Sequence, residues 1–218
     1  IVDGDKGLPQ GAYIDHWHDR GIMMEGISLP PGPLLAALPG AGYAFKELAA
    51  KRRNIATFGI MVSDFGAGRV RRGFGEAPFT ATYQLTQVDA ETLRFAMTRL
   101  GELYFEAGAK RLFTNVAPMP VVTSRDDLKR FETIPIKPGH FELMAFHPTG
   151  TCAMNVKPGK GVVNSLLRTY DIPNLYIMDG SVVPDALGVN PQVTIMGLAH
   201  HATTLLAEKL SASLCSIS

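Results

Sequence analysis

The feature that most constrains this chain is a set of three short motifs in its last third. They read His147-Pro-Thr-Gly-Thr-Cys-Ala-Met154, Asn174-Leu-Tyr-Ile-Met-Asp-Gly-Ser181 and Gly188-Val-Asn-Pro-Gln-Val-Thr-Ile195. Each motif joins apolar residues to a glycine or a proline, the two residues that most alter what the backbone can do. The three motifs therefore predict a tightly specified loop, a strand end and a helix start.

The first motif predicts a stiff loop that presents one imidazole. Pro148 disfavours helical backbone at His147, so His147 is expected to be extended. Gly150 then allows a tight turn. An imidazole held in this way suits proton transfer, because the ordinary pKa of histidine lies near neutrality.

The second and third motifs predict a strand end and a helix start. Residues 175–178 are apolar and are expected to form a strand that ends at Asp179 and Gly180. Asn190 followed by Pro191 is the pattern of a helix N-cap with proline at the first helical position. A fixed imidazole, a strand-end carboxylate and an exposed helix N-terminus suit redox chemistry on a bound anionic cofactor.

These motifs resemble the C-terminal signature of the glucose–methanol–choline family of flavin oxidoreductases, in particular the branch of cholesterol oxidases and long-chain alcohol oxidases. That branch shows similar H-P-x-G-x-C, D-G-S and G-V-N-P-x-x-T-I blocks in the same order. Residues 54–70 and 101–109 resemble its sheet strand with the following turn and its surface helix end. The resemblance implies FAD as cofactor and oxidation of a primary or secondary alcohol, hydrophobic or sterol-like, to the carbonyl.

The resemblance also implies roles for two polar side chains. His147 would be the base that takes the hydroxyl proton, close to the flavin. Asn190 would bind the substrate oxygen, because its amide can both donate and accept a hydrogen bond. Both side chains would have to converge on one substrate oxygen. The alternative interpretation of His147 is a structural histidine with no part in chemistry.

Five further residues would meet the cofactor by the same resemblance. Pro191, Gln192 and Val193 would face the flavin ring, where the positive end of the helix dipole favours the charge of reduced flavin. Asp179 and Gly180 would meet the ribityl or pyrophosphate portion, Gly180 mainly through its backbone. The alternative for Asp179 is that it only caps the turn after the strand.

The implied fold is α/β. Residues 1–165 would form most of an α+β substrate domain with an antiparallel sheet, and residues 166–218 would add a strand and a helix to a doubly wound FAD-binding domain.

The G-x-G-x-x-G turn that binds a dinucleotide pyrophosphate is absent, since Gly66-Ala-Gly68 leads into Arg69-Val-Arg-Arg rather than a helix. We therefore expect a fragment, processed piece or split subunit that needs an N-terminal FAD-binding half, on the same or a separate chain, and binds no FAD tightly alone.

Periodicity predicts most other elements. Asp89 is the expected N-cap of a helix over 90–107 that Gly108 ends, and Ser124 is expected to start a short helix. Strands are expected over 21–29, 55–63 and 79–85, a short helical or irregular segment over 34–38, and a last helix over 191–210.

Composition excludes several classes of function. The net charge is +1 without a basic block, which argues against nucleic-acid binding. No apolar run is long enough for a transmembrane helix. Cys152 and Cys215 do not make a disulfide framework, so reduced thiols are expected, which favours a cytoplasmic location without establishing it, and a signal peptide stays open.

Two other functions remain open. One is a non-catalytic binding or assembly module that retains the family's shape. The other is metal-dependent hydrolysis at His16 and His18, although alternate strand residues share a face without any metal.

The sequence also shows no carboxylate closer than Glu47 to residues 51–54, where the branch has a proton-moving glutamate, so plain alcohol oxidation is favoured over steroid isomerisation. Neither the alcohol nor the electron acceptor, oxygen or another, follows from the sequence.

Overall fold

The computed structural model describes residues 10–215 and divides into two compact units. Unit 1 takes in the described residues up to Ala67 and Tyr83–Leu143, and unit 2 takes in Gly68–Thr82 and the described residues from Met144 onwards. Helices and small antiparallel sheets occur together, which confirms the mixed α/β class. The predicted domain boundary at residue 165 stays a prediction.

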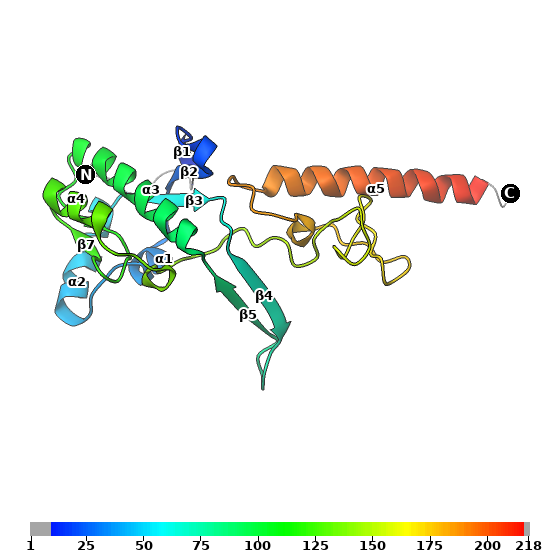
Figure 1. The fold of residues 1–218 in the computed structure, drawn as a ribbon, viewed down its shortest axis with the longest axis horizontal. Coiled ribbons are helices and arrows are strands. Elements are labelled where there is room, and N and C mark those ends of the chain that lie inside the picture. The colour runs from blue at the N-terminus through cyan, green and yellow to red at the C-terminus, as the bar shows by residue number, and fades with distance from the viewer. Residues whose placement is uncertain (1–9, 216–218) are drawn as a thin grey trace. The chain divides into compact units, whose positions relative to one another are not determined.

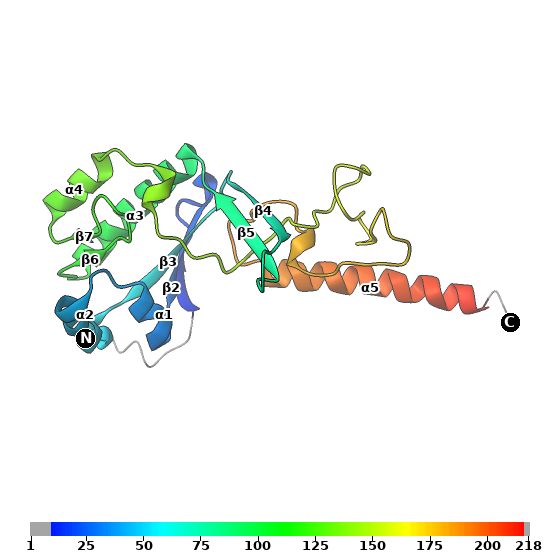
Figure 2. The ribbon, with the colours of Figure 1, turned by 90° about the horizontal axis from the view of Figure 1, so that it is seen from below.

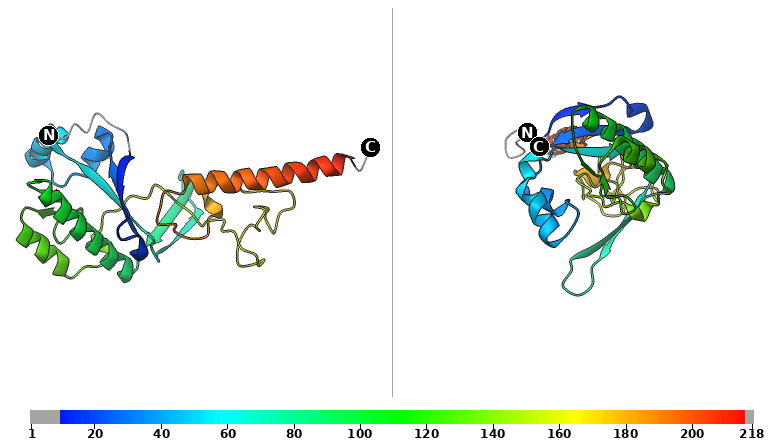
Figure 3. Two further views of the ribbon diagram at one scale, coloured as in Figure 1. Left: turned by 90° about the horizontal axis from the view of Figure 1, so that it is seen from above. Right: turned by 90° about the vertical axis from the view of Figure 1, so that its left-hand side faces the viewer.

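Unit 1 is built on an antiparallel sheet of three strands, β1 (Gln10–Ile14), β2 (Ile22–Ile27) and β3 (Thr57–Val62), in the order β1-β2-β3. The expected strands over 21–29 and 55–63 are confirmed as β2 and β3. Because strand side chains alternate, Ile22 and Met24 share one face, where they are buried against Ala96 and Leu100. These two residues belong to helix α3 (Gln87–Glu106), which lies along this sheet (Figures 2 and 3).

Helix α3 (Gln87–Glu106) confirms the long helix, but the prediction of Asp89 as its N-cap is wrong. Thr86 is the cap, and its hydroxyl accepts the backbone N–H of Asp89 at 3.2 Å. The Asp89 carboxylate accepts the N–H of Thr86 at 2.8 Å in return, so the two residues form a capping box. The other carboxylate oxygen accepts the N–H of Phe65 at 2.8 Å, which ties the loop after β3 to this helix start. Gly108 follows the helix at φ 88°, the left-handed stop that was predicted.

The rest of unit 1 packs on the other side of α3. Helix α4 (Arg125–Thr133) begins as predicted at Ser124, whose hydroxyl accepts the N–H of Asp127 at 3.0 Å. The hydroxyl and N–H of Thr123 also donate to Asp127 and hold the pKa of that carboxyl below its ordinary value. Strands β6 (Leu112–Phe113) and β7 (Val121–Val122) complete this core, in which the buried residues are Ala90, Val116, Val122, Leu128, Phe131 and Ile136.

Short helices make up the connections of unit 1. Two α-helices and a 3₁₀ helix lie between the paired strands β2 and β3: α1 (Pro31–Ala36), α2 (Gly42–Ala50) and η2 (Arg52–Asn54). Of these, the sequence predicted only α1. Further 3₁₀ turns are η1 (His18–Arg20) and η3 (Pro138–His140).

Unit 2 has little regular sheet. Strands β4 (Ala67–Arg72) and β5 (Phe79–Gln84) pair as a hairpin whose residues are exposed (Figure 1), and β5 was predicted. The 3₁₀ helix η4 (Gly180–Val182) and the last helix α5 (Gln192–Cys215) follow. The expected strand over 175–178 is not formed. Tyr176 makes one antiparallel bridge to Arg168, because the facing segment is a short turn that offers no longer ladder.

No helix within the described part of the chain has both the length and the apolar character needed to cross a membrane.

The structure predicts that Asp89→Ala destabilises unit 1. Asp89 is buried, so its loss leaves the N–H groups of Phe65 and Thr86 without their acceptor, each at a cost of about 1–3 kcal/mol. We expect urea unfolding to show a loss of roughly 2–4 kcal/mol in the free energy of unfolding. Asp89→Asn keeps one oxygen acceptor and should lose less. The exposed Asp126→Ala is the control, and equal losses in Asp89→Ala and Asp126→Ala would contradict the prediction.

Candidate active site

The three motifs meet in the core of unit 2. Met154 ends the first motif, Val182 follows the second, and Ala202 lies in the helix that the third motif opens. All three belong to one hydrophobic cluster. Its buried members are Val163, Leu167, Val182 and Ala202, and Met154, Ile177, Met178 and Leu198 pack against them. Burial of apolar surface therefore holds together segments that are distant in the sequence.

The loop that carries His147 is hydrogen-bonded to η4. The N–H of Cys152 donates to the carbonyl of Ser181 at 2.9 Å, and the N–H of Met154 donates to the carbonyl of Val182 at 2.8 Å. Gly150 adopts φ 84°, so the predicted tight turn is present. The loop is thereby fixed along its backbone to the end of the second motif.

Gly180 is the point where all three motifs touch. A Cβ built on Gly180 would lie 3.1 Å from Cδ1 of Ile195, in the first turn of α5, and 3.3 Å from the carbonyl oxygen of Pro148, next to His147. Both distances are shorter than ordinary van der Waals contact of about 3.5–4.0 Å. The absence of a side chain at Gly180 is therefore what lets the imidazole loop and the helix start approach the same turn.

Asp179 caps this turn. Its Oδ1 accepts the N–H of Ser181 at 2.8 Å, and it is the N-cap of η4. The hydroxyl and N–H of Ser181 hold the pKa of Asp179 below its ordinary value, while the slight burial of the carboxyl opposes them. The structure thus shows the capping interpretation of Asp179. Its predicted contact with the cofactor, like that of Gly180, stays a prediction.

Helix α5 begins one residue later than predicted. The N–H of Ile195 donates to the carbonyl of Pro191 at 2.9 Å, so Pro191 provides the first helical acceptor and takes the cap position that was expected for Asn190. Gln192 and Val193 then form the exposed start of the helix, whose first turn has no acidic residue. This start can hold an anion, because the first N–H groups of a helix have no partner within it.

His147 and Asn190 lie in the same unit. The His147 side chain is exposed and Asn190 is half-buried. Pro148, next to His147, and Ile195, in the helix that follows Asn190, approach a common turn at Gly180, which brings the two motifs side by side. That the two side-chain ends converge on one substrate oxygen stays a prediction.

The histidines at 16 and 18 do not lie in a strand, which corrects the alternation on which their shared face was argued. His18 begins η1 and its Nδ1 lies 3.2 Å from Oδ1 of Asp19, while the His16 ring packs edge-on against Trp17 with ring centres 5.1 Å apart. Over residues 10–215, no group of three or more His, Cys, Asp or Glu side chains is placed to hold a metal ion.

Sequence reasoning missed Glu25. In the sheet, Glu25 of β2 lies directly opposite Gly59 of β3, and it is 6% exposed. Along the chain, Glu47 is the carboxylate nearest to residues 51–54, as the sequence indicated. Pairing of β2 with β3 adds a buried carboxylate, Glu25, opposite the strand that follows those residues. Only the strand register, which one sequence does not show, could have found it.

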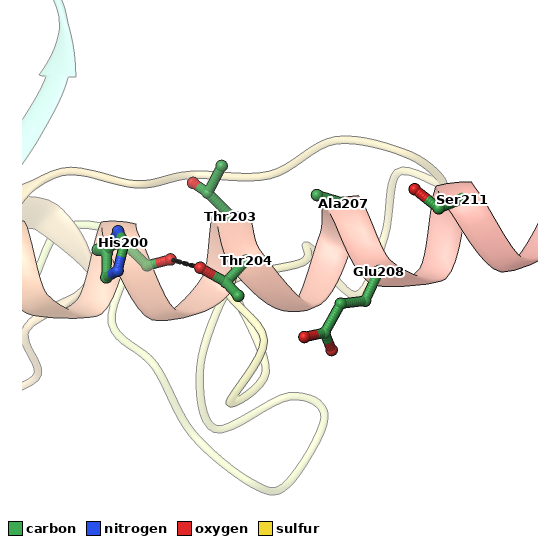
Figure 4. Close-up of a pocket in the computed structure, with 6 residues that line it drawn as sticks. All are labelled: His200, Thr203, Thr204, Ala207, Glu208 and Ser211. Atoms are coloured by element: carbon green, nitrogen blue, oxygen red, sulfur yellow. Dashed lines mark hydrogen bonds between the residues drawn. The ribbon is translucent and has the colours of Figure 1, made fainter.

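A shallow depression lies along α5, away from the motif residues (Figure 4). It is lined by His200, Thr203, Thr204, Ala207, Glu208 and Ser211. The Thr204 hydroxyl donates to the carbonyl of His200 at 3.0 Å within the helix. Because one helix provides every lining side chain, nothing faces a ligand from another side, and we assign no site there.

The packing predicts that Gly180→Ala loosens the motif junction. The added methyl would press on Ile195 and on the carbonyl of Pro148, and such overpacking costs typically about 1–3 kcal/mol. Thermal melting of Gly180→Ala should show a lower Tm than that of the parent. Gly139→Ala is the control, because a Cβ there meets no atom within 4 Å. An unchanged Gly180→Ala melt would show that the junction is not tight.

The lowered pKa of Asp179 predicts a dependence of stability on pH. Because the folded pKa lies below the ordinary 3.8, the capping contribution is present above about pH 4 and is lost as pH falls through the folded value. Asp179→Asn keeps a capping oxygen without titrating, so it should lose less stability than the parent as the pH falls below about 4. Urea unfolding across this range checks the difference, and the exposed Asp171→Asn is the control. Parallel pH curves for Asp179→Asn and the parent would refute it.

Comparison of the sequence with known proteins finds relatives over most of this chain. An uncharacterized GMC-type oxidoreductase of Mycobacterium tuberculosis is 33% identical over 199 residues, which cover 89% of this chain and 30% of that protein. A long-chain-alcohol oxidase of Arabidopsis thaliana is 28% identical over 200 residues, covering 86% of this chain and 26% of the other. A cholesterol oxidase of Acinetobacter baumannii is 41% identical over 63 residues, covering 29% and 11%.

The chain thus spans less than a third of the length of these relatives. The family described as GMC oxidoreductase matches residues 68–199, a range that includes the three motifs and more than half of the chain. This chain belongs to the GMC oxidoreductase family.

Proposed function

We propose that this chain supplies the catalytic base and the substrate-orienting amide of an FAD-dependent oxidation of an alcohol to its carbonyl. The observation that carries the proposal is the junction at Gly180, where the loop of His147 and the start of α5 approach one turn. Two of the relatives are a long-chain-alcohol oxidase and a cholesterol oxidase, and both names describe oxidation of hydroxyl compounds. This supports a hydrophobic or sterol-like alcohol as the substrate.

His147 would take the proton of the substrate hydroxyl. The side chain is exposed on a loop whose backbone is hydrogen-bonded at Cys152 and Met154, so the imidazole is presented from a fixed loop. Asn190, immediately before α5, would orient the substrate oxygen. Its amide can donate to that oxygen both in the alcohol and in the carbonyl product.

The helix start fits a flavin. Gln192 and Val193 are exposed, and the first turn of α5 carries no acidic side chain that would repel an anion. We assign Pro191, Gln192 and Val193 to the ring, and Asp179 and Gly180 to the ribityl or pyrophosphate portion. When bound, FAD would accept the hydride from the alcohol carbon as the hydroxyl proton passes to His147.

The remaining part of the cofactor site belongs, in this proposal, to an N-terminal FAD-binding half. The alternative is a non-catalytic module that keeps the fold. A flavin spectrum of the full-length protein discriminates between the two. In an anaerobic solution, an alcohol substrate should bleach the oxidised flavin band, whereas a protein that shows no flavin, or a flavin that no alcohol reduces, would support the module.

The proposal predicts that His147→Ala in the full-length enzyme lowers kcat by roughly 10²–10⁴, the range for loss of a positioned base. The pH dependence of kcat/KM should also lose the inflection that belongs to the imidazole. Asn190→Ala should lower kcat as well, and Asn190→Asp tests whether an amide donor rather than shape is needed. Stopped-flow reduction of the flavin measures the chemical step directly. If His147→Ala reduces its flavin at the parent rate, His147 is not the base.

A further inference from the structure

We propose that Asp179 and Ser181 are positioning residues for His147, acting through the backbone of its loop. This inference rests on the proposed function of His147 as the base. It gives the second motif a role in proton transfer besides the cofactor contact implied by resemblance.

Ser181 links the cap to the loop. Its N–H donates to Oδ1 of Asp179 at 2.8 Å, and its carbonyl accepts the N–H of Cys152 at 2.9 Å. Ser181 is therefore hydrogen-bonded on one side to the Asp179 cap and on the other side to the His147 loop. The carbonyl of Ser181 shares a planar peptide with the N–H of Val182, which donates to the backbone carbonyl of Asp179 at 3.2 Å. The turn that Asp179 caps therefore sets the direction of the carbonyl with which Cys152 pairs.

Successive residues of η4 hold the same loop at three points. Gly180 approaches the carbonyl of Pro148, Ser181 binds Cys152, and Val182 accepts the N–H of Met154 at 2.8 Å. The first of these contacts is one residue from His147. A shift of η4 would therefore move the backbone on which the imidazole is mounted.

The electrostatics of Asp179 agree with a structural task. The hydroxyl and the N–H of Ser181 both favour its ionised form and lower its pKa, so the carboxylate is charged near neutral pH. A charged N-cap binds an N–H group more strongly than a neutral one does. The cap is consequently firm under the conditions in which an imidazole base would act.

The test uses the full-length enzyme with FAD bound. Asp179→Ala removes the cap, and we expect kcat to fall roughly 10- to 100-fold, since misplacement of a catalytic group by about 1 Å can cost 10²-fold. The KM for the alcohol should stay near the parent value, and kcat is compared at saturating FAD because the proposed function also places Asp179 against the cofactor. Asp179→Asn, which keeps an acceptor for Ser181, should recover part of the lost turnover. Ser181→Ala should lower kcat, and Ser181→Thr, which retains the hydroxyl, should restore it.

Matched controls are Asp171→Ala and Ser165→Ala, because both are exposed residues of unit 2 outside η4 and the loop. Thermal melting identifies any variant that fails to fold. Two results would overturn the inference: weaker FAD binding in Asp179→Ala with unchanged kcat at saturating FAD, or equal loss of kcat in Asp179→Asn and Asp179→Ala. An inactive His147→Ala beside fully active Asp179 and Ser181 variants would reject the positioning role alone, while an active His147→Ala would reject the proposed function.

Discussion

The close approach of the His147 loop and of the first turn of α5 to Gly180 is the constraint on which the candidate site depends. A carbonyl beside His147 and a side chain from the first turn of α5 press on a position where no Cβ is present. Burial of apolar side chains in the core of unit 2 supplies the free energy that holds the three motifs together. The contact at Gly180 fixes how closely the His147 loop and α5 approach the turn. The His147 loop is hydrogen-bonded to η4, and η4 packs on α5. Together they hold the backbone that carries His147 in place without a regular sheet around it.

Local rules predicted those features that short stretches of sequence determine. Ser124 before two aspartates specifies the start of α4, and Gly108 specifies the end of α3, because each acts on backbone groups within one turn. The α3 cap was missed by one turn because Thr86 and Asp89 can each cap a helix, and the reciprocal bonds of the capping box settled the choice. The motifs around His147 and Asn190 could be found for the same reason, but not the way they meet.

Features that depend on distant partners could not be predicted. Glu25 comes beside β3 through strand register, which no local pattern encodes. Residues 175–178 read as a strand, yet a ladder needs a facing segment of matching length, and the described chain offers only the short turn near Arg168. The role of Ser181 was equally hidden, since its carbonyl becomes important only when Cys152 faces it.

The pairing of β2 with β3 has a consequence for how this chain can change during evolution. The two strands enclose residues 28–56, so α1 and α2 form an excursion whose ends are fixed by the ladder from Ile22–Val62 to Ile27–Thr57. Closing a flexible loop costs only about 0.6 kcal/mol more for each doubling of its length. Insertions and deletions within this excursion are therefore inexpensive, and homologues can differ in length there while Glu25 keeps its place opposite Gly59.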